Sequence, residues 1–159
     1  MSDEHTNGFD ERDDEISAEE LLECLRSTTL VMILGTIQFL EERRIPVDDW
    51  IVDLSTIFAR GWDLNEDWSP EELLQAVLFN LAALGGETIQ AQYGDDDASA
   101  VVERFPDKER VAELGLDETN GDIILNLVRP IAAACGMNWS WRRDGDRIIV
   151  ELSRSKVTT

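Results

Sequence analysis

The sequence predicts an α+β fold: three N-terminal helices, then a β-hairpin, two helices and a C-terminal β-hairpin, the hairpins forming an antiparallel sheet covered by helices. Three observations predict it. Apolar residues recur at helical spacing through the first half of the chain. Two later stretches alternate instead, and each surrounds a turn rich in Gly and Asp. The length of 159 residues suits one domain with one core.

The first helix is predicted to begin after Ser17 and to end before Pro46. The Ser17 side chain can accept from the free N–H groups of the first turn, and Glu20 can reach back to it, which makes a capping box. If its apolar stripe is wider than one core can cover, the helix favours a homodimer. The stripe consists of Leu21, Leu25, Met32, Thr36 and Leu40, with Leu22, Thr29, Ile33 and Ile37 beside it.

Two shorter helices are expected next. The second places Trp50, Ile51, Leu54, Ile57 and Phe58 on one face and ends at Gly61. The third begins with Ser69 as the cap, Pro70 at the first helical position and Glu72 at the third, and it ends at Gly85-Gly86.

The middle of the chain changes period. Ile89, Ala91 and Tyr93 alternate, residues 94–97 form a turn, and Val101, Glu103 and Phe105 follow as a return strand. Residues 98–104 also tolerate a helix, so the sequence leaves residues 88–105 open between a hairpin and a helix. Two helices are expected next, one over residues 107–114 and one over 122–135 that Thr119 caps and Pro130 kinks.

The C-terminal hairpin has the strongest local signal. Asp144-Gly145 is typical of a two-residue type I′ turn between alternating segments. The register that it predicts pairs Trp141 with Ile148, Trp139 with Val150 and Met137 with Leu152, all on one face. On the other face it places Arg142 opposite Arg147.

The charge of the chain limits its partners. Residues 1–16 are expected to be a disordered acidic leader, 17–154 a single α+β domain and 155–159 a flexible tail. The formal net charge of −20 excludes direct binding to nucleic acids or anionic membranes. It is consistent with solubility, with a cationic partner or divalent metal, or with mimicry of DNA. Two distant cysteines and no signal peptide predict a cytoplasmic protein.

Three groups of residues are candidates for binding. Trp139, Trp141 and Tyr93 could line a ligand pocket between the sheet and the helices, or simply belong to the core. Arg142, Arg143 and Arg147 gather positive charge on an acidic protein, which suits an acidic partner or an anion; the alternative is that neighbouring Asp and Glu residues neutralise them. Asp63, Asn65 and Asp67 alternate as in a calcium loop.

The calcium pattern is incomplete. Trp68 stands where the loop needs Gly, and Leu74 where it needs a bidentate Glu, so the start of a helix also explains the segment. Calcium or magnesium is the only cofactor that the residues suggest, and we otherwise expect none. No residue is assigned a catalytic role, because His5 is the only histidine and neither cysteine belongs to a cluster.

Three functions compete on this evidence. The leading hypothesis is a non-enzymatic cytosolic binding or regulatory module, which acts on a protein partner or on a small ligand held between the sheet and the helices. The alternatives are a metal-dependent or acid/base enzyme that uses Asp and Glu, and an acidic inhibitor that mimics DNA. The enzyme requires carboxylates that converge in a cleft, whereas mimicry requires two rows of them at phosphate-like spacing.

Overall fold

A computed structural model describes residues 16–64, 66–115 and 121–155. The predicted leader and tail, and the cap at Thr119, lie almost wholly outside these ranges and stay predictions. The elements in chain order are α1 (Ala18–Glu42), α2 (Val47–Ala59), α3 (Pro70–Ala83), β1 (Glu87–Tyr93), β2 (Asp97–Glu103), α4 (Lys108–Glu113), the 3-10 helix η1 (Ile123–Leu127), α6 (Val128–Ala134), β3 (Met137–Asp144) and β4 (Arg147–Arg154).

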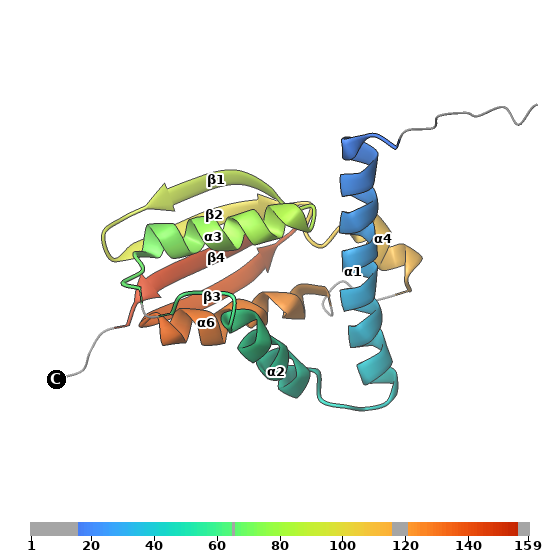
Figure 1. The fold of residues 1–159 in the computed structure, drawn as a ribbon, viewed down its shortest axis with the longest axis horizontal. Coiled ribbons are helices and arrows are strands. Elements are labelled where there is room, and N and C mark those ends of the chain that lie inside the picture. Colours follow the sequence, from blue (N-terminus) through green and yellow to red (C-terminus); the bar gives the residue numbers. More distant parts are fainter. Residues whose placement is uncertain (1–15, 65, 116–120, 156–159) are drawn as a thin grey trace, which may run out of the picture.

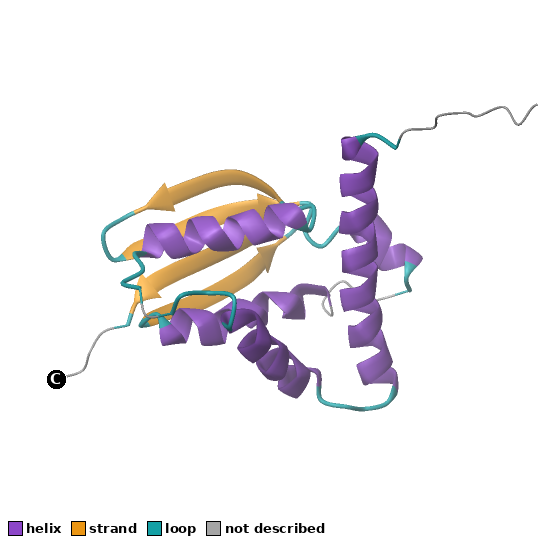
Figure 2. Ribbon diagram, viewed as in Figure 1, coloured by secondary structure: helices purple, strands orange, loops and turns teal. Residues whose placement is uncertain are grey.

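The predicted fold class is confirmed. The two hairpins form one antiparallel sheet in the order β1-β2-β4-β3. Helices α3 and α6 cover one face of this sheet, and α1 stands across the end of the domain (Figures 1 and 2). The main core fills the space between α3, α6 and this face, where the inward residues of β2 and β4 are completely buried.

The starts of α1 and α3 form as predicted. Ser17 and Ser69 each accept a hydrogen bond from the backbone N–H three residues later, and Glu20 and Glu72 accept the reciprocal bonds. These bonds favour the ionised carboxylates, so the pKa of Glu20 and of Glu72 is lowered from its ordinary value. The structure therefore confirms the capping box predicted at Ser17 and shows that the predicted cap at Ser69 is a capping box as well.

Residues 88–105 form a hairpin rather than a helix. Its return strand, β2, ends at Glu103, before Phe105, and its buried residues are Ala98, Ala100 and Val102. Phe105 is also buried, but it lies beyond the strand. The prediction of a strand through Phe105 was therefore wrong, and the inward residues of β2 belong to the same core cluster as the buried residues of α3.

The segment 122–135 is not one kinked helix. It consists of η1 and then α6, which begins two residues before Pro130. Proline lacks an N–H group, and it fits the first turn of a helix because the N–H groups there have no partner in the helix. The chain therefore starts a new helix near Pro130 instead of bending a continuous one.

The register of the C-terminal hairpin differs from the prediction by two residues. Trp139 pairs with Leu152 and Trp141 with Val150. The cause is the turn: Gly145 has a φ of +62° and takes the first central position, and Asp146, whose φ is not positive, takes the second. This is the pattern of a type II′ turn rather than type I′. A shift of two residues keeps each side chain on its face, so the apolar face was predicted correctly.

Gly145→Val is expected to lower the free energy of unfolding by about 2 kcal/mol, because a β-branched residue resists positive φ. Urea denaturation would measure the loss. Gly61→Val is the matched control, since Gly61 is also exposed but does not have a positive φ. Equal losses for the two variants would contradict the turn geometry.

Candidate functional site

The structure separates the three predicted pocket residues. Trp139 and Trp141 lie on β3 and Tyr93 on β1, which are the two opposite edges of the sheet. Trp139 is only 5% exposed, and its Nε1 donates to the backbone oxygen of Leu125 at 2.9 Å. The Nε1 of Trp141 donates to Asn126 Oδ1 at 2.9 Å, and its ring is partly buried. Both tryptophans thus fasten η1 to β3.

The three predicted docking arginines do not form one patch. Arg142 pairs with Ile149 across the hairpin, not with Arg147 as predicted, because the register is shifted. Arg147 Nε donates to Glu103 Oε1 at 2.7 Å on the exposed face of the sheet. Arg143 lies on the opposite face, because successive residues of a strand alternate. The structure therefore divides the arginines between two sides of the sheet.

Arg143 makes the one strongly buried ion pair among the described residues. Its guanidinium donates from Nε and Nη2 to the two carboxylate oxygens of Asp122, which is 3% exposed. The same Nη2 donates to the backbone oxygen of Phe105 at 3.0 Å. Three segments meet here: the end of β3, the start of η1 and the loop after β2. This two-pronged geometry is the strongest form of an arginine–carboxylate pair.

The predicted calcium residues lie on an exposed loop. Asp63 and Asp67 are exposed, and Asn65 lies outside the described residues. The loop is fixed by tryptophans: Trp68 Nε1 donates to the backbone oxygen of Asp63 at 2.8 Å, and the Trp62 and Trp68 rings lie 5.5 Å apart. Within the described ranges, no group of three or more His, Cys, Asp and Glu side chains could hold a metal ion.

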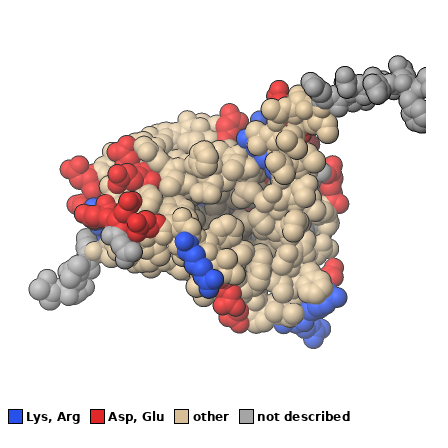
Figure 3. Space-filling view, viewed as in Figure 1, with Lys and Arg blue, Asp and Glu red and all other residues tan. Residues whose placement is uncertain are grey.

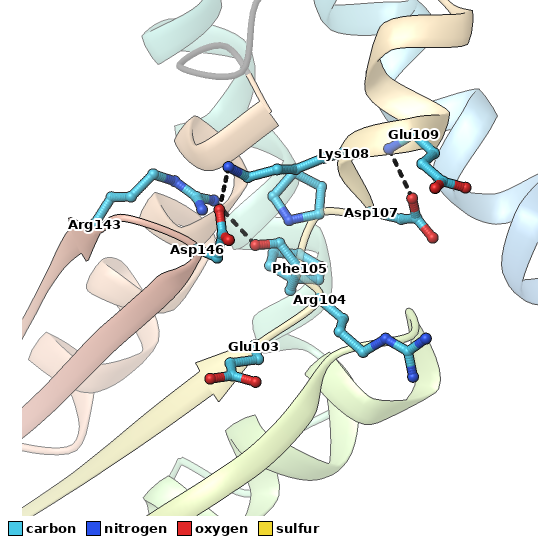
Figure 4. A pocket seen from close by; sticks show the side chains of 9 residues that line it. Glu103, Arg104, Phe105, Asp107, Lys108, Glu109, Arg143 and Asp146 are labelled. Carbon is cyan, nitrogen blue, oxygen red and sulfur yellow. Dashed lines mark hydrogen bonds and ion pairs between the residues drawn. The ribbon is translucent and has the colours of Figure 1, made fainter.

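A charged pocket of about 360 Å³ lies where β2, α4 and the C-terminal hairpin meet (Figure 4). Two interactions lie within its lining: Lys108 pairs with Asp146, and the Asp107 carboxylate accepts the backbone N–H of Glu109 at 2.9 Å. Lys108 lowers the pKa of Asp146 through a hydrogen bond and its charge. The lining contains no Ser, Cys or His, so it offers no nucleophile of these types.

A second cavity, of about 220 Å³, is almost entirely apolar. It lies on the helical side of the sheet, and α1, α2, α3, η1 and α6 all contribute to it. In Figure 3 the middle of the face shown is hollowed between uncharged side chains, and acidic residues gather toward its margins. The lining consists of Thr29, Ile33, Phe58, Trp62, Val77, Asn80, Leu81, Ala83, Leu84, Phe105, Ile124, Leu125, Leu127, Val128 and Ile131.

The position of α2 leaves this apolar cavity open. Ser55 is completely buried and donates to the backbone oxygen of Leu127 at 2.7 Å, which fixes α2 against η1. The sequence places Ile57 and Phe58 on the core face of this helix, but they are 58% and 52% exposed. Phe58 reaches the rim of the cavity and Ile57 does not. The sequence pattern did not indicate this site because the buried side of α2 carries Val47, Ile51 and Ser55, and Ser55 is a polar residue that packs there through a bond to a distant carbonyl.

Comparison with models of known protein families and with curated protein sequences gave no match. Among the described residues, no helix is both long enough and apolar enough to cross a membrane. The function must therefore be argued from the two cavities. In the charged cavity Lys108 and Asp146 already pair with each other, whereas the apolar cavity presents uncharged walls and an exposed aromatic rim. The apolar cavity is the stronger candidate.

Proposed function

We propose that the protein is a non-enzymatic cytoplasmic binding module whose apolar cavity receives the apolar face of a helix from a protein partner. The observation that supports it is the lining, which is apolar apart from Thr29 and Asn80 and includes the half-exposed Phe58 ring. A groove between helices is a common receptor for an amphipathic helix. The free thiols of Cys24 and Cys135 agree with a reducing compartment.

The size of the cavity favours a peptide over a small molecule. Pockets that enclose a drug-sized ligand have volumes of about 300–1,000 Å³. A volume of about 220 Å³ suits one or two large anchor side chains, with the rest of the partner lying across the rim. Four lining residues are exposed and would form this rim: Thr29, Phe58, Asn80 and Ala83.

The charge of the protein defines the other face of the partner. At a net charge of −20, the surface attracts cations over its whole extent. A helix with Leu or Phe on one face and Lys or Arg on the other would gain from both the cavity and the surrounding field. We therefore propose a basic amphipathic segment as the ligand, with the charge setting the association rate and the cavity setting the dissociation rate.

The test is a peptide titration with a matched pair of variants. The probe is a helical peptide with Leu or Phe on one face and Lys on the other, followed by isothermal titration calorimetry. Phe58→Glu is expected to weaken binding about tenfold or more, because it places a charge on the rim of an apolar site. Ile57→Glu adds the same charge at the preceding residue of α2, which lies outside the cavity. It is expected to leave the peptide affinity nearly unchanged.

A scrambled peptide of the same composition distinguishes binding in the cavity from non-specific electrostatic binding to the acidic surface. It should bind weakly, lose its affinity in salt and not distinguish the two variants. Equal affinities for the two peptides, or equal losses in the two variants, would overturn the proposal. Saturable binding of indole alone that competes with the peptide would favour a small ligand instead.

A further inference from the structure

Only one side of helix α1 packs into the core of its own chain. Leu30, Leu34, Ile37 and Leu40 are buried, and they form a second core cluster with Val47 and Ile51 of α2 and Val111 of α4. On a helix of 3.6 residues per turn, Leu30, Leu34 and Ile37 lie on one side. The apolar residues that the sequence placed in the helix stripe are therefore only partly used, since Leu21, Leu25 and Met32 are exposed.

The opposite side of α1 carries an exposed apolar seam. Its residues are separated by four, three, four, three and four positions. The large apolar residues among them are about half exposed or more. This alternation is the heptad spacing by which two helices pack along their length. The α1 seam consists of Leu21, Leu25, Thr28, Met32, Gly35 and Phe39.

The six seam residues are uncharged on a highly charged protein, although the Arg43 guanidinium lies 3.6 Å over the Phe39 ring at one end of the seam. Residues 27–40 contain no Asp, Glu, Lys or Arg, although such residues make up 30% of the chain. Exposed helix surfaces normally carry charge, and a continuous apolar strip is typical of an interface. Like charge would keep two copies apart elsewhere on the surface, so this strip is where a second copy can approach at least electrostatic cost.

No close contact among the described residues requires a glycine at position 35. Glycine in the middle of a helix weakens it, and a Cβ atom at Gly35 would meet nothing within 4 Å. The backbone of Gly35 is thus left open to close approach from outside. The first part of α1 also lacks support, because every residue from 16 to 25 is exposed. A short projecting stretch of helix is marginal alone and gains most from a packed neighbour.

The seam is complementary to itself when it is reversed. Placing a second α1 antiparallel, with the two centres aligned, sets Leu25 against the partner's Gly35 and Met32 against the partner's Thr28. Leu21 and the partner's Phe39 then meet at each end. Large residues face small ones in the middle, and the arrangement has the two-fold symmetry of an isologous dimer. A parallel pair would instead face Gly35 with Gly35 and Met32 with Met32.

We propose that the α1 seam binds the seam of a second copy of this chain, in antiparallel orientation, to form a homodimer. The inference does not depend on the proposed function, because none of the six seam residues lines the apolar cavity. The apolar cavity of each copy therefore remains available to a partner in the dimer.

The decisive measurement is molar mass by sedimentation equilibrium on the full chain. The wild type is expected at twice 18.0 kDa, and Met32→Glu is expected to weaken the dimer about a hundredfold, because each dimer would bury two carboxylates, each against a Thr28 side chain. Phe79→Glu is the matched control: Phe79 is 76% exposed on α3, outside the seam, and its replacement should leave the dimer intact. Added salt should strengthen the wild-type dimer by screening its repulsion.

Gly35→Leu tests the seam without adding charge. The monomer has room for the side chain, so the midpoint temperature of unfolding, measured at low protein concentration, should be unchanged or slightly higher. The dimer should dissociate more readily. A wild type that remains at 18.0 kDa at its solubility limit would overturn the proposal. So would a Met32→Glu variant that dimerises as well as Phe79→Glu.

Cys24 tests the orientation. In the antiparallel dimer the two Cys24 residues lie about 18 Å apart along the helix axis, beyond the reach of a disulfide. In a parallel dimer they would lie at the same level on facing helices. Mild oxidation of a Cys135→Ser variant is therefore expected to produce no cross-linked dimer, and efficient cross-linking through Cys24 would overturn the antiparallel arrangement.

Discussion

Replacing Asp122 with alanine is expected to lower the free energy of unfolding by about 3–5 kcal/mol, as is usual when one member of a buried ion pair is removed. The Arg143 side chain, four-fifths buried, would lose both of its carboxylate bonds and keep mainly its bond to the Phe105 carbonyl. The end of β3 would then be held less firmly to η1. Urea denaturation, followed by circular dichroism, would measure the loss.

A double variant and an exposed pair serve as controls for Asp122. Asp122→Leu combined with Arg143→Met removes both charges and should cost clearly less than Asp122→Ala, because no charge is left buried alone. Arg147→Met breaks the bond to Glu103 on the exposed face of the sheet and should cost about 1 kcal/mol or less. If Asp122→Ala cost no more than Arg147→Met, the buried pair would not stabilise the fold as described.

Trp139→Ala is expected to cost about 3–5 kcal/mol, the usual loss for a large aromatic residue in a core. The ring packs among the buried residues of the sheet and the helices, and its Nε1 satisfies the Leu125 carbonyl. The substitution would leave a cavity and remove one of the two hydrogen bonds that the Leu125 carbonyl accepts, the other coming from the Val128 N–H. Thermal and urea denaturation should both report the loss.

Trp139→Phe separates the two contributions to this loss. It keeps most of the ring volume and removes one hydrogen bond, while the Leu125 carbonyl keeps its bond from the Val128 N–H, so it should cost about 0.5–1.5 kcal/mol, the usual net value of one hydrogen bond. Tyr93→Ala, at the exposed opposite edge of the sheet, should cost less than either. A Trp139→Ala variant with wild-type stability would contradict the core position of this residue.

The parts of the fold that the sequence predicts well depend on local chemistry. Ser17 and Ser69 begin helices because a side-chain oxygen three residues before a glutamate satisfies backbone donors, whatever the rest of the chain does. Gly85 and Gly145 end elements because they adopt positive φ. The order of elements follows from such signals, and with it the α+β class.

The hairpin register is a local error, because the turn at Gly145 is type II′ rather than type I′. Other errors arise where distant residues decide the outcome. The alternation of β3 places Arg143 on the same face as Trp141, next to the core. The charge is tolerated there because Asp122, at the start of η1, pairs with it, and no local pattern indicates this pair. Likewise, the hydrogen bond from Ser55 to the Leu127 carbonyl holds α2 against η1. In this position Phe58 reaches the rim of the cavity. The cavity has walls from five elements, so no local pattern could have indicated it.

The place of β4 in the sheet has a consequence for how the domain folds. It is the last element of the described chain, yet it lies inside the sheet and pairs with both β2 and β3. The hairpin β1-β2 cannot join β3 until β4 lies between them. During synthesis the ribosome must therefore release residues up to Arg154 before the sheet can close, and until then α3 can pack only against the β1-β2 hairpin. Such late, long-range closure slows folding and leaves the core of the domain incomplete until β4 has emerged.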